Sequence, residues 1–251
     1  MNRREAMLGA ALGLSSSAAS AFAAAPDRTD MTSFTSGGVP IAVEWFAAPG
    51  RGAGARGPAV LLLHGADGLT FGEGYRLAAR VLASNGYHVA FLHYLDRTGD
   101  RRVVYSRLRH DYPAWMATVR DAVTWLAGQP GVDPARLGLV GVSLGAALAF
   151  ETAATDERVK AIVDYFGPLP EGFAGRAKRL PPTLILHGAL DGIVPVANAH
   201  GLEALLRGLN TPYEIQIYPD QGHGFFGLAQ FDSATRVSAF LGRHLNGPRS
   251  G

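Results

Sequence analysis

The 251-residue chain contains no cysteine. This absence excludes a disulfide framework, a thiolate metal site and a cysteine nucleophile. Charged residues are also few, at 18% of the chain, and the formal net charge is only +2. No run of lysine and arginine is long enough to form a stripe that binds nucleic acid, so we expect no nucleic-acid partner.

The first 25 residues differ in composition from the rest. Paired arginines at positions 3–4 precede an apolar run from Ala6 to Leu14, and small residues follow. This order is typical of an export signal, and the run is shorter than the ~20 residues that a membrane-spanning helix needs. We therefore predict a signal peptide over residues 1–25, cleaved after Ala23 or Ala25, and a periplasmic or secreted protein without stable membrane insertion after cleavage. The paired arginines resemble a twin-arginine signal, and a general secretory signal is the alternative.

The rest of the chain, residues 26–251, has a length that suits one large α/β domain, and 47% of the whole sequence is hydrophobic. A polar stretch over residues 27–36 comes first, and short aliphatic runs then alternate with amphipathic segments of helical length. The predicted strands are 39–46, 59–63, 88–94, 137–142, 161–166, 183–186 and 214–218, and the predicted helices include 115–126, 196–209 and 231–245. This alternation predicts an α/β fold with a mostly parallel, doubly wound sheet flanked by helices.

The stretch from Gly167 to Pro182 is the only internal segment rich in glycine and proline that is long enough to consider as a linker. At about 15 residues it is too short to form an independent domain above the sheet. We therefore predict an open site without a large cap domain.

A candidate nucleophile lies in the sequence Gly141-Val142-Ser143-Leu144-Gly145, between a predicted buried strand and a segment of small residues. A serine in a tight strand-to-helix turn presents its hydroxyl outward, and small flanking residues let the two elements approach closely. We predict that Ser143 is the nucleophile. The backbone N–H of Leu144, at the start of the helix, and that of Ala66, after the first buried strand, are the predicted oxyanion donors.

A serine hydroxyl needs a base within hydrogen-bonding distance. His223 is the best candidate of the eight histidines, because it lies between two glycines in a loop after the last predicted strand. The others border or lie in predicted strands, or lie on or near helical segments: His64, His88, His93, His110, His187, His200 and His244. We predict that His223 is the general base.

The acid that orients the histidine should follow an earlier strand. Asp191 lies in a loop after the predicted strand 183–186, where an aspartate that only caps the next helix is the alternative. Asp164, near the end of the preceding run, is the rival candidate. The order Ser143, Asp191, His223 is the order in which α/β hydrolases place their triad.

With these motifs, the chain resembles the dienelactone hydrolase family of the α/β-hydrolase superfamily, from Val39 to Leu245. The resemblance implies an α/β-hydrolase fold and a reaction that needs no metal or organic cofactor. Two positions depart from the founding members, which use a cysteine nucleophile and a glutamate in the loop after the first buried strand. This sequence has Ser143 and Gly65 there, so the serine must be activated by His223 directly.

We therefore expect a serine hydrolase that cleaves small carboxylic esters through an acyl-enzyme on Ser143. Its partner would be a small-molecule ester or lactone. The alternatives are a lactone or dienelactone hydrolase, and a hydrolase fold that only binds, since a fold alone does not establish catalysis. The sequence does not indicate an oligomeric state, the export route or the acyl and alcohol preference.

Overall fold

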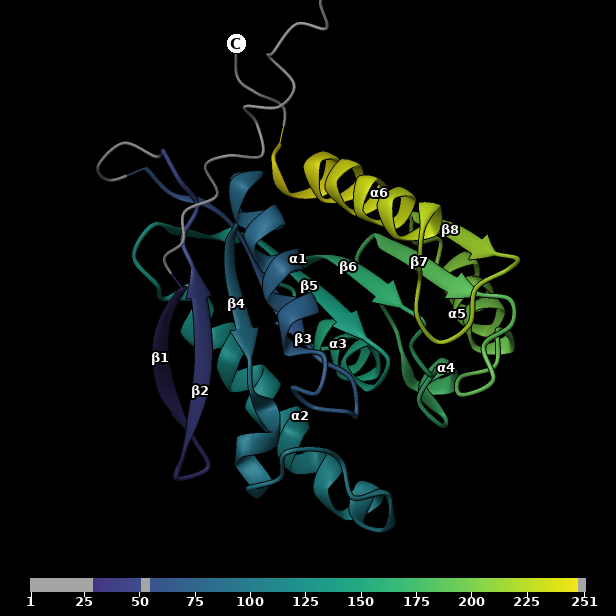
Figure 1. Ribbon diagram of the computed structural model, residues 1–251, viewed down its shortest axis with the longest axis horizontal. Helices are drawn as coiled ribbons and strands as arrows, with labels where there is room; N and C mark the ends of the chain where they lie inside the picture. The colour runs from purple at the N-terminus through teal and green to yellow at the C-terminus, as the bar shows by residue number, and fades with distance from the viewer. Residues whose placement is uncertain (1–28, 51–54, 248–251) are drawn as a thin grey trace, which may run out of the picture.

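The structure is a computed structural model that describes residues 29–50 and 55–247 (Figure 1). The predicted signal peptide, residues 1–25, lies outside the described residues. The strands are β1 (Thr29–Ser36), β2 (Val39–Phe46), β3 (Gly57–Leu63), β4 (His88–Leu92), β5 (Val132–Val142), β6 (Val159–Tyr165), β7 (Thr183–Gly188) and β8 (Tyr213–Tyr218). The α-helices are α1 (Gly72–Ser84), α2 (Leu108–Ala127), α3 (Leu144–Ala153), α4 (Phe173–Arg176), α5 (Ala197–Gly208) and α6 (Leu228–Leu245). The 3-10 helices η2 (Tyr94–Thr98) and η3 (Tyr105–Arg107) lie between β4 and α2.

The eight strands form one sheet in the order β1-β2-β4-β3-β5-β6-β7-β8. The six strands from β3 to β8 run parallel to one another. Strand β2 pairs antiparallel with β4, and β1 pairs antiparallel with β2 at the edge of the sheet. All seven residues of β3 are buried, as expected for a central strand that is covered on both faces. The predicted fold class is therefore confirmed.

Two apolar cores cover the two faces of the sheet. On one face Leu61 and Leu63 of β3 belong to the same core as residues of α2, α3 and α5, among them Trp115. On the other face Val60 and Leu62 belong to a core with residues of α1 and α6, the two helices that Figure 1 shows on the same side of the sheet. Alternate side chains of one strand thus enter opposite cores, which is the pattern of a doubly wound sheet.

The structure shifts several of the predicted boundaries and adds a strand. Strand β4 ends at Leu92 instead of Tyr94, because the chain turns at His93 into η2. Strand β5 begins at Val132, five residues before its apolar run. The polar residues 29–36 form β1, which pairs with β2 and places Phe34 opposite Ile41. This edge strand is mostly exposed and polar, so it lacks the apolar run by which the other strands were predicted.

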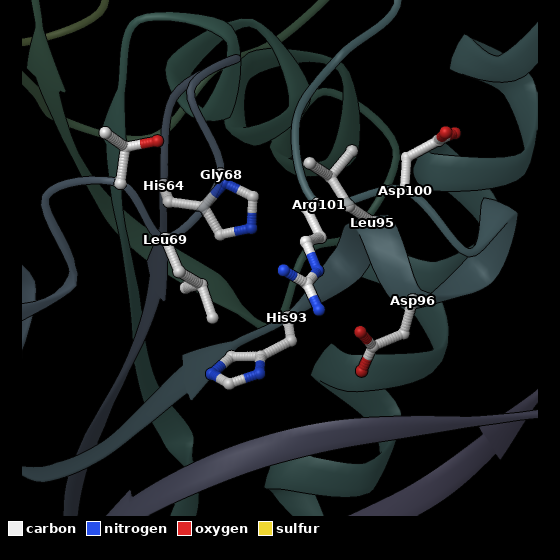
Figure 2. Close-up of a pocket in the computed structure, with 9 residues that line it drawn as sticks. His64, Gly68, Leu69, His93, Leu95, Asp96, Asp100 and Arg101 are labelled. Atoms are coloured by element: carbon white, nitrogen blue, oxygen red, sulfur yellow. The ribbon is translucent and has the colours of Figure 1, made fainter.

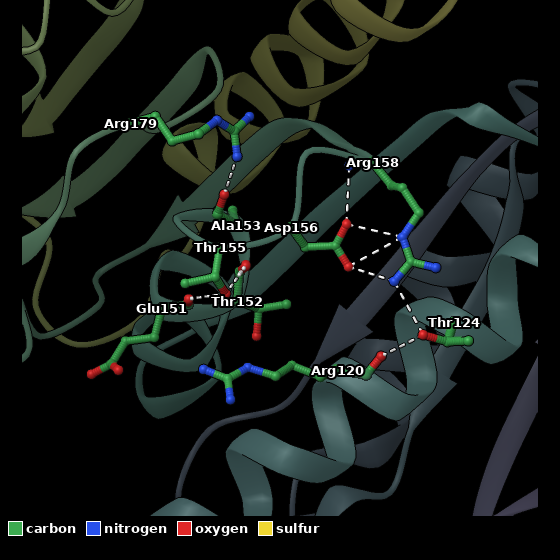
Figure 3. Close-up of polar contacts among 9 residues, drawn as sticks. All are labelled: Arg120, Thr124, Glu151, Thr152, Ala153, Thr155, Asp156, Arg158 and Arg179. Atoms are coloured by element: carbon green, nitrogen blue, oxygen red, sulfur yellow. Dashed lines mark hydrogen bonds and ion pairs between the residues drawn. The ribbon is translucent and has the colours of Figure 1, made fainter.

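The connection between α3 and β6 is held by charged and polar contacts (Figure 3). Asp156 accepts hydrogen bonds from the guanidinium of Arg158, at 2.6 Å for the shortest, and this arginine also donates to the Thr124 hydroxyl of α2 at 3.1 Å. The contact with Arg158 holds the pKa of Asp156 below its usual value. Arg179 donates to the carbonyl of Ala153, the last residue of α3. These contacts hold the C-terminal end of α3, the helix that follows Ser143.

The predicted absence of a large cap is also confirmed. Between β6 and β7 the chain forms only the one-turn helix α4 and irregular segments. The carboxyl ends of β5, β6 and β7 therefore meet loops and not a folded cap.

Candidate active site

Ser143 lies at the junction of β5 and α3, in a strained backbone conformation with φ of +52° and ψ of −118°. Non-glycine residues with such values are rare and occur where the surrounding structure holds them in place. The Ser143 N–H donates to the Tyr165 carbonyl of β6 at 2.9 Å. The turn therefore has the geometry that the Gly141–Gly145 motif predicts.

Close backbone contact explains the second glycine of that motif. A Cβ atom on Gly145 would lie 2.4 Å from the Leu63 carbonyl oxygen and 2.6 Å from that of His64. No side chain fits at such distances. The start of α3 thus lies directly against the end of β3, which places Ser143 beside the turn that follows β3.

The structure brings His223 to Ser143 across 80 residues of sequence. The Nε2 atom of His223 lies 3.0 Å from the Ser143 hydroxyl oxygen, and its Nδ1 atom lies 2.7 Å from Asp191 Oδ2. The ring also lies against the aromatic ring of Phe166, with 4.6 Å between the ring centres. This contact comes from the turn after β6, and no sequence pattern indicated it.

The Asp191 side chain is fully buried and its two oxygens have different partners. Oδ1 accepts the backbone N–H groups of Ile193 and Val194, at 2.9 and 2.8 Å, whereas Oδ2 accepts from His223. Asp191 thus makes both contacts that the sequence allowed, one with the backbone of its own turn and one with His223. His187 Nε2 is 3.5 Å from the same Oδ2 but is hydrogen-bonded to the Val194 carbonyl, and burial lowers the pKa of His187.

The rival carboxylate, Asp164, does not reach His223. It lies within β6, is completely buried, and accepts the backbone N–H of Gly167 at 2.7 Å. Burial raises its pKa to about 8, so this side chain is mostly a neutral acid at neutral pH. The structure therefore places Asp191, and not Asp164, next to the predicted base.

The two predicted oxyanion donors lie in the two segments next to Ser143, the start of α3 and the turn after β3. Leu144 is the first residue of α3, where backbone N–H groups have no acceptor within the helix. A Cβ on Gly65 would lie 3.4 Å from Ser143 Cβ, so the turn that carries Ala66 lies beside the serine. Within the described part of the chain, no hydrogen bond engages the N–H of Ala66 or Leu144. Both groups can donate to a ligand.

A further carboxylate lies near the serine and was not predicted. A Cβ on Gly65 would be only 2.6 Å from Asp67 Oδ1, so Asp67 fills the space that a side chain at position 65 would occupy. Burial raises the pKa of Asp67, and the nearby His223 opposes that shift. A glutamate at position 65, as the family resemblance would have it, would displace Asp67.

Residues 29–50 and 55–247 contain no group of three histidine, aspartate or glutamate side chains placed to hold a metal ion. No helix in these ranges is long and apolar enough to span a bilayer.

A mostly parallel sheet with a serine at a strained strand-to-helix turn, and a histidine from a late loop, defines an α/β-hydrolase. The model of the dienelactone hydrolase family matches residues 46–239. The chain belongs to this family, as its motifs predicted.

The curated relatives match only part of the chain. A putative carboxymethylenebutenolidase of Escherichia coli O157:H7 is 29% identical over 119 residues, which are 44% of each chain. A thiohydrolase of Aspergillus aculeatus is 34% identical over 109 residues, 43% of this chain and 33% of the relative. The chain therefore spans less than half the length of these relatives.

Solved structures match over most of the chain. A putative dienelactone hydrolase of Klebsiella pneumoniae has a TM-score of 0.74 and 22% identity, covering 86% of this chain and 99% of the other. A dienelactone hydrolase of Anabaena variabilis has a TM-score of 0.70 and 23% identity, covering 87% and 98%. At these identities the likeness establishes the fold.

Proposed function

We propose that this protein is a serine-dependent carboxylic ester hydrolase. The observation that carries the proposal is the position of His223, whose two ring nitrogens lie within hydrogen-bonding distance of Ser143 and Asp191. A carboxylate oxygen can only accept a hydrogen bond, so Nδ1 carries the proton and Nε2 has the free lone pair that can accept the serine proton.

In the proposed first step, the Ser143 oxygen attacks the ester carbonyl carbon while His223 Nε2 takes the hydroxyl proton. The buried Asp191 carboxylate stabilises the imidazolium that forms. The carbonyl oxygen becomes negatively charged, and the N–H groups of Ala66 and Leu144 donate to it. The bond between the carbonyl carbon and the alcohol oxygen then breaks while His223 protonates that oxygen. The alcohol departs, and the acyl group remains bound to Ser143.

The second step uses the same groups with water in place of the serine. His223 removes a proton from the water, which attacks the acyl carbonyl, and the carboxylic acid departs as the proton returns to Ser143. The chemistry therefore uses only side chains and backbone amides of this chain. Removal of one such oxyanion donor typically costs about 10² to 10³ in kcat.

Small esters are the proposed substrate class. The site has no large cap, and the loops that carry Asp191 and His223 bear side chains that are largely exposed: Leu190, Ile193, Phe226 and Leu228. These apolar groups can contact a short acyl or alcohol group without enclosing a long one.

A lactone is the second candidate substrate, because several relatives are named putative carboxymethylenebutenolidases. A lactone is a cyclic ester, and the same attack by Ser143 would open the ring. A panel of aryl esters and lactones of matched size distinguishes the two, since the better substrate gives the higher kcat/KM.

Covalent labelling with a fluorophosphonate, followed by peptide mapping, is the decisive test. We expect a single adduct on the peptide that contains Ser143. A label at any other residue contradicts the assignment of the nucleophile. Absence of any label supports the third candidate, a hydrolase fold that only binds.

A further inference from the structure

A cavity of about 390 Å³ lies beside the proposed catalytic groups, between the turn after β3 and the segment after β4 (Figure 2). Its walls include His64, Leu69, Leu95 and Arg101. Its volume falls in the range of sites that bind small molecules. None of these side chains has a role in the proposed ester hydrolysis.

His64 provides a hydrogen-bond acceptor to the cavity. The residue is only 1% exposed, and its ring stacks on Tyr94 with 4.2 Å between the ring centres. Its Nδ1 lies 2.8 Å from the Gly65 carbonyl oxygen. A carbonyl can only accept, so Nδ1 carries the proton and Nε2 has the free lone pair. Burial lowers the pKa of His64 to about 4, which keeps the ring neutral.

The Nε2 atom has no hydrogen-bond partner within residues 29–50 and 55–247, and Figure 2 shows the ring directed into the cavity. A ring nitrogen that faces the cavity and has no partner within the protein can accept a hydrogen bond from a ligand, so the site suits a ligand that donates one here. A hydroxyl group is such a donor.

Arg101 provides an uncommitted cation on the opposite wall. Its guanidinium makes no hydrogen bond or ion pair with any described residue, although two aspartates line the same cavity. Asp96 accepts the backbone N–H of Ala42, and Asp100 forms an ion pair with Arg107. Arg101 is an exposed residue, and its guanidinium offers its donors to a ligand in the planar arrangement that matches a carboxylate.

The charges around the cavity limit the ligand to a single negative charge. Arg101 is one cation, and Asp96 and Asp100 would repel a dianion such as a phosphate monoester. His93 also lines the cavity, but its Nε2 lies 3.0 Å from Glu44, which Arg76 binds as well. Leu69 and Leu95 suit a short apolar body between the two polar ends.

From these contacts we propose that the cavity is a binding site for a short hydroxycarboxylate, whose hydroxyl donates to His64 Nε2 and whose carboxylate accepts from Arg101. The site lies next to the oxyanion turn. The N–H of Val103 donates to the Ala66 carbonyl at 2.8 Å, so the segment that carries Arg101 also holds the residue predicted to stabilise the oxyanion.

The test measures binding directly, by calorimetric titration of the full-length Ser143→Ala protein, so that turnover plays no part. The probes are 3-hydroxybutyrate, butyrate, which lacks the hydroxyl, and 1,3-butanediol, which lacks the carboxylate. We expect 3-hydroxybutyrate to bind at least roughly tenfold more tightly than either analogue, because each analogue loses one of the two polar contacts.

Variants of the cavity assign each contact. Arg101→Met should reduce the affinity for 3-hydroxybutyrate to that for 1,3-butanediol. Arg102→Met is the matched control, since this neighbouring arginine is exposed like Arg101 but does not line the cavity, and it should leave the affinity unchanged. His64→Phe keeps an aromatic ring against Tyr94 and should make 3-hydroxybutyrate bind no better than butyrate.

If His64→Phe does not fold, the comparison of 3-hydroxybutyrate with butyrate still tests the contact with His64. This comparison removes the hydroxyl from the ligand and leaves the protein unchanged. Absence of measurable binding, equal binding of all three probes, or binding that Arg101→Met leaves intact would overturn the proposal. A failure of the hydrolase proposal would appear in the fluorophosphonate experiment and not in these titrations.

Discussion

Asp191 Oδ2 lies 2.7 Å from Nδ1 of His223, while Asp191 Oδ1 is held by two backbone N–H groups of its own loop. The backbone of its own turn therefore holds the carboxylate in place independently of the contact with the imidazole. Asp191→Asn should lower kcat by roughly 10³ to 10⁴-fold at neutral pH, because an amide neither fixes the correct tautomer nor stabilises the imidazolium. Steady-state kinetics with an aryl ester measure this loss.

Asp164→Asn is the control for that substitution, since Asp164 is a buried carboxyl that contacts Gly167 and not His223. We expect it to change stability more than kcat. If Asp164→Asn abolished turnover and Asp191→Asn did not, the acid of the triad would be Asp164.

Ser143→Ala should abolish ester turnover and leave the thermal midpoint nearly unchanged. The hydroxyl makes one hydrogen bond, to His223, and contributes far more to the proposed chemistry than to packing. Differential scanning calorimetry and an esterase assay on the same preparation test both parts. Residual turnover at the wild-type rate would show that another nucleophile carries the reaction.

The raised pKa of Asp164 predicts a dependence of stability on pH. The folded protein holds this proton up to a pH of about 8, whereas the unfolded chain releases it near the ordinary value of 3.8. The native state thus binds more protons between these values, so the Asp164 contribution is full below about pH 4 and is lost as the pH rises to about 8.

Asp164→Asn removes this titration. Denaturant unfolding at a series of pH values should show the free energy of unfolding of the wild type falling relative to that of the variant, by on the order of a few kcal/mol between pH 4 and 8. The difference should be constant above pH 8. Parallel curves for the two proteins would mean that Asp164 titrates normally.

Short acyl chains should be preferred, because the segment between β6 and β7 forms only the one-turn helix α4 and provides no cap domain to enclose a long chain. We expect p-nitrophenyl acetate or butyrate to give a higher kcat/KM than p-nitrophenyl esters of long fatty acids. A preference for a long chain would indicate that the segment 167–182, or a second subunit, forms an apolar channel.

Export remains a prediction of the sequence. Purified mature protein should begin at Ala24 or Pro26, which Edman sequencing or intact-mass measurement decides. Substitution of both arginines at positions 3 and 4 by lysine should block export if the signal is of the twin-arginine type, and should have little effect on a general secretory signal. Recovery of periplasmic protein with Met1 intact would contradict cleavage.

The features that the sequence predicted correctly depend on local patterns. The aliphatic run of β3 and the helical face around Trp115 are recognisable over a few residues. The glycines on both sides of Ser143 and His223 also lie within single loops. Each motif therefore predicted its residue independently, and the structure brings the three side chains together.

The features that the sequence did not predict depend on contacts between distant segments. Strand β1 is polar, and its strand structure follows from its pairing with β2. The position of Asp67 over Gly65 and the contact of Phe166 with His223 require that separate turns meet in space. The same holds for the cavity, whose donor and acceptor come from segments that are 37 positions apart, at His64 and Arg101.

The close packing of Gly145 against the carbonyls of Leu63 and His64 distinguishes a tightly packed part of the proposed active site from a part that is formed by surface loops. Ser143 and the start of α3 are packed against the backbone at the end of β3, with no space for a side chain at position 145. Asp191 and His223 belong to loops with exposed side chains. Evolution or an engineer can therefore exchange surface residues of these loops to accept new substrates, while the geometry of attack on the carbonyl is preserved.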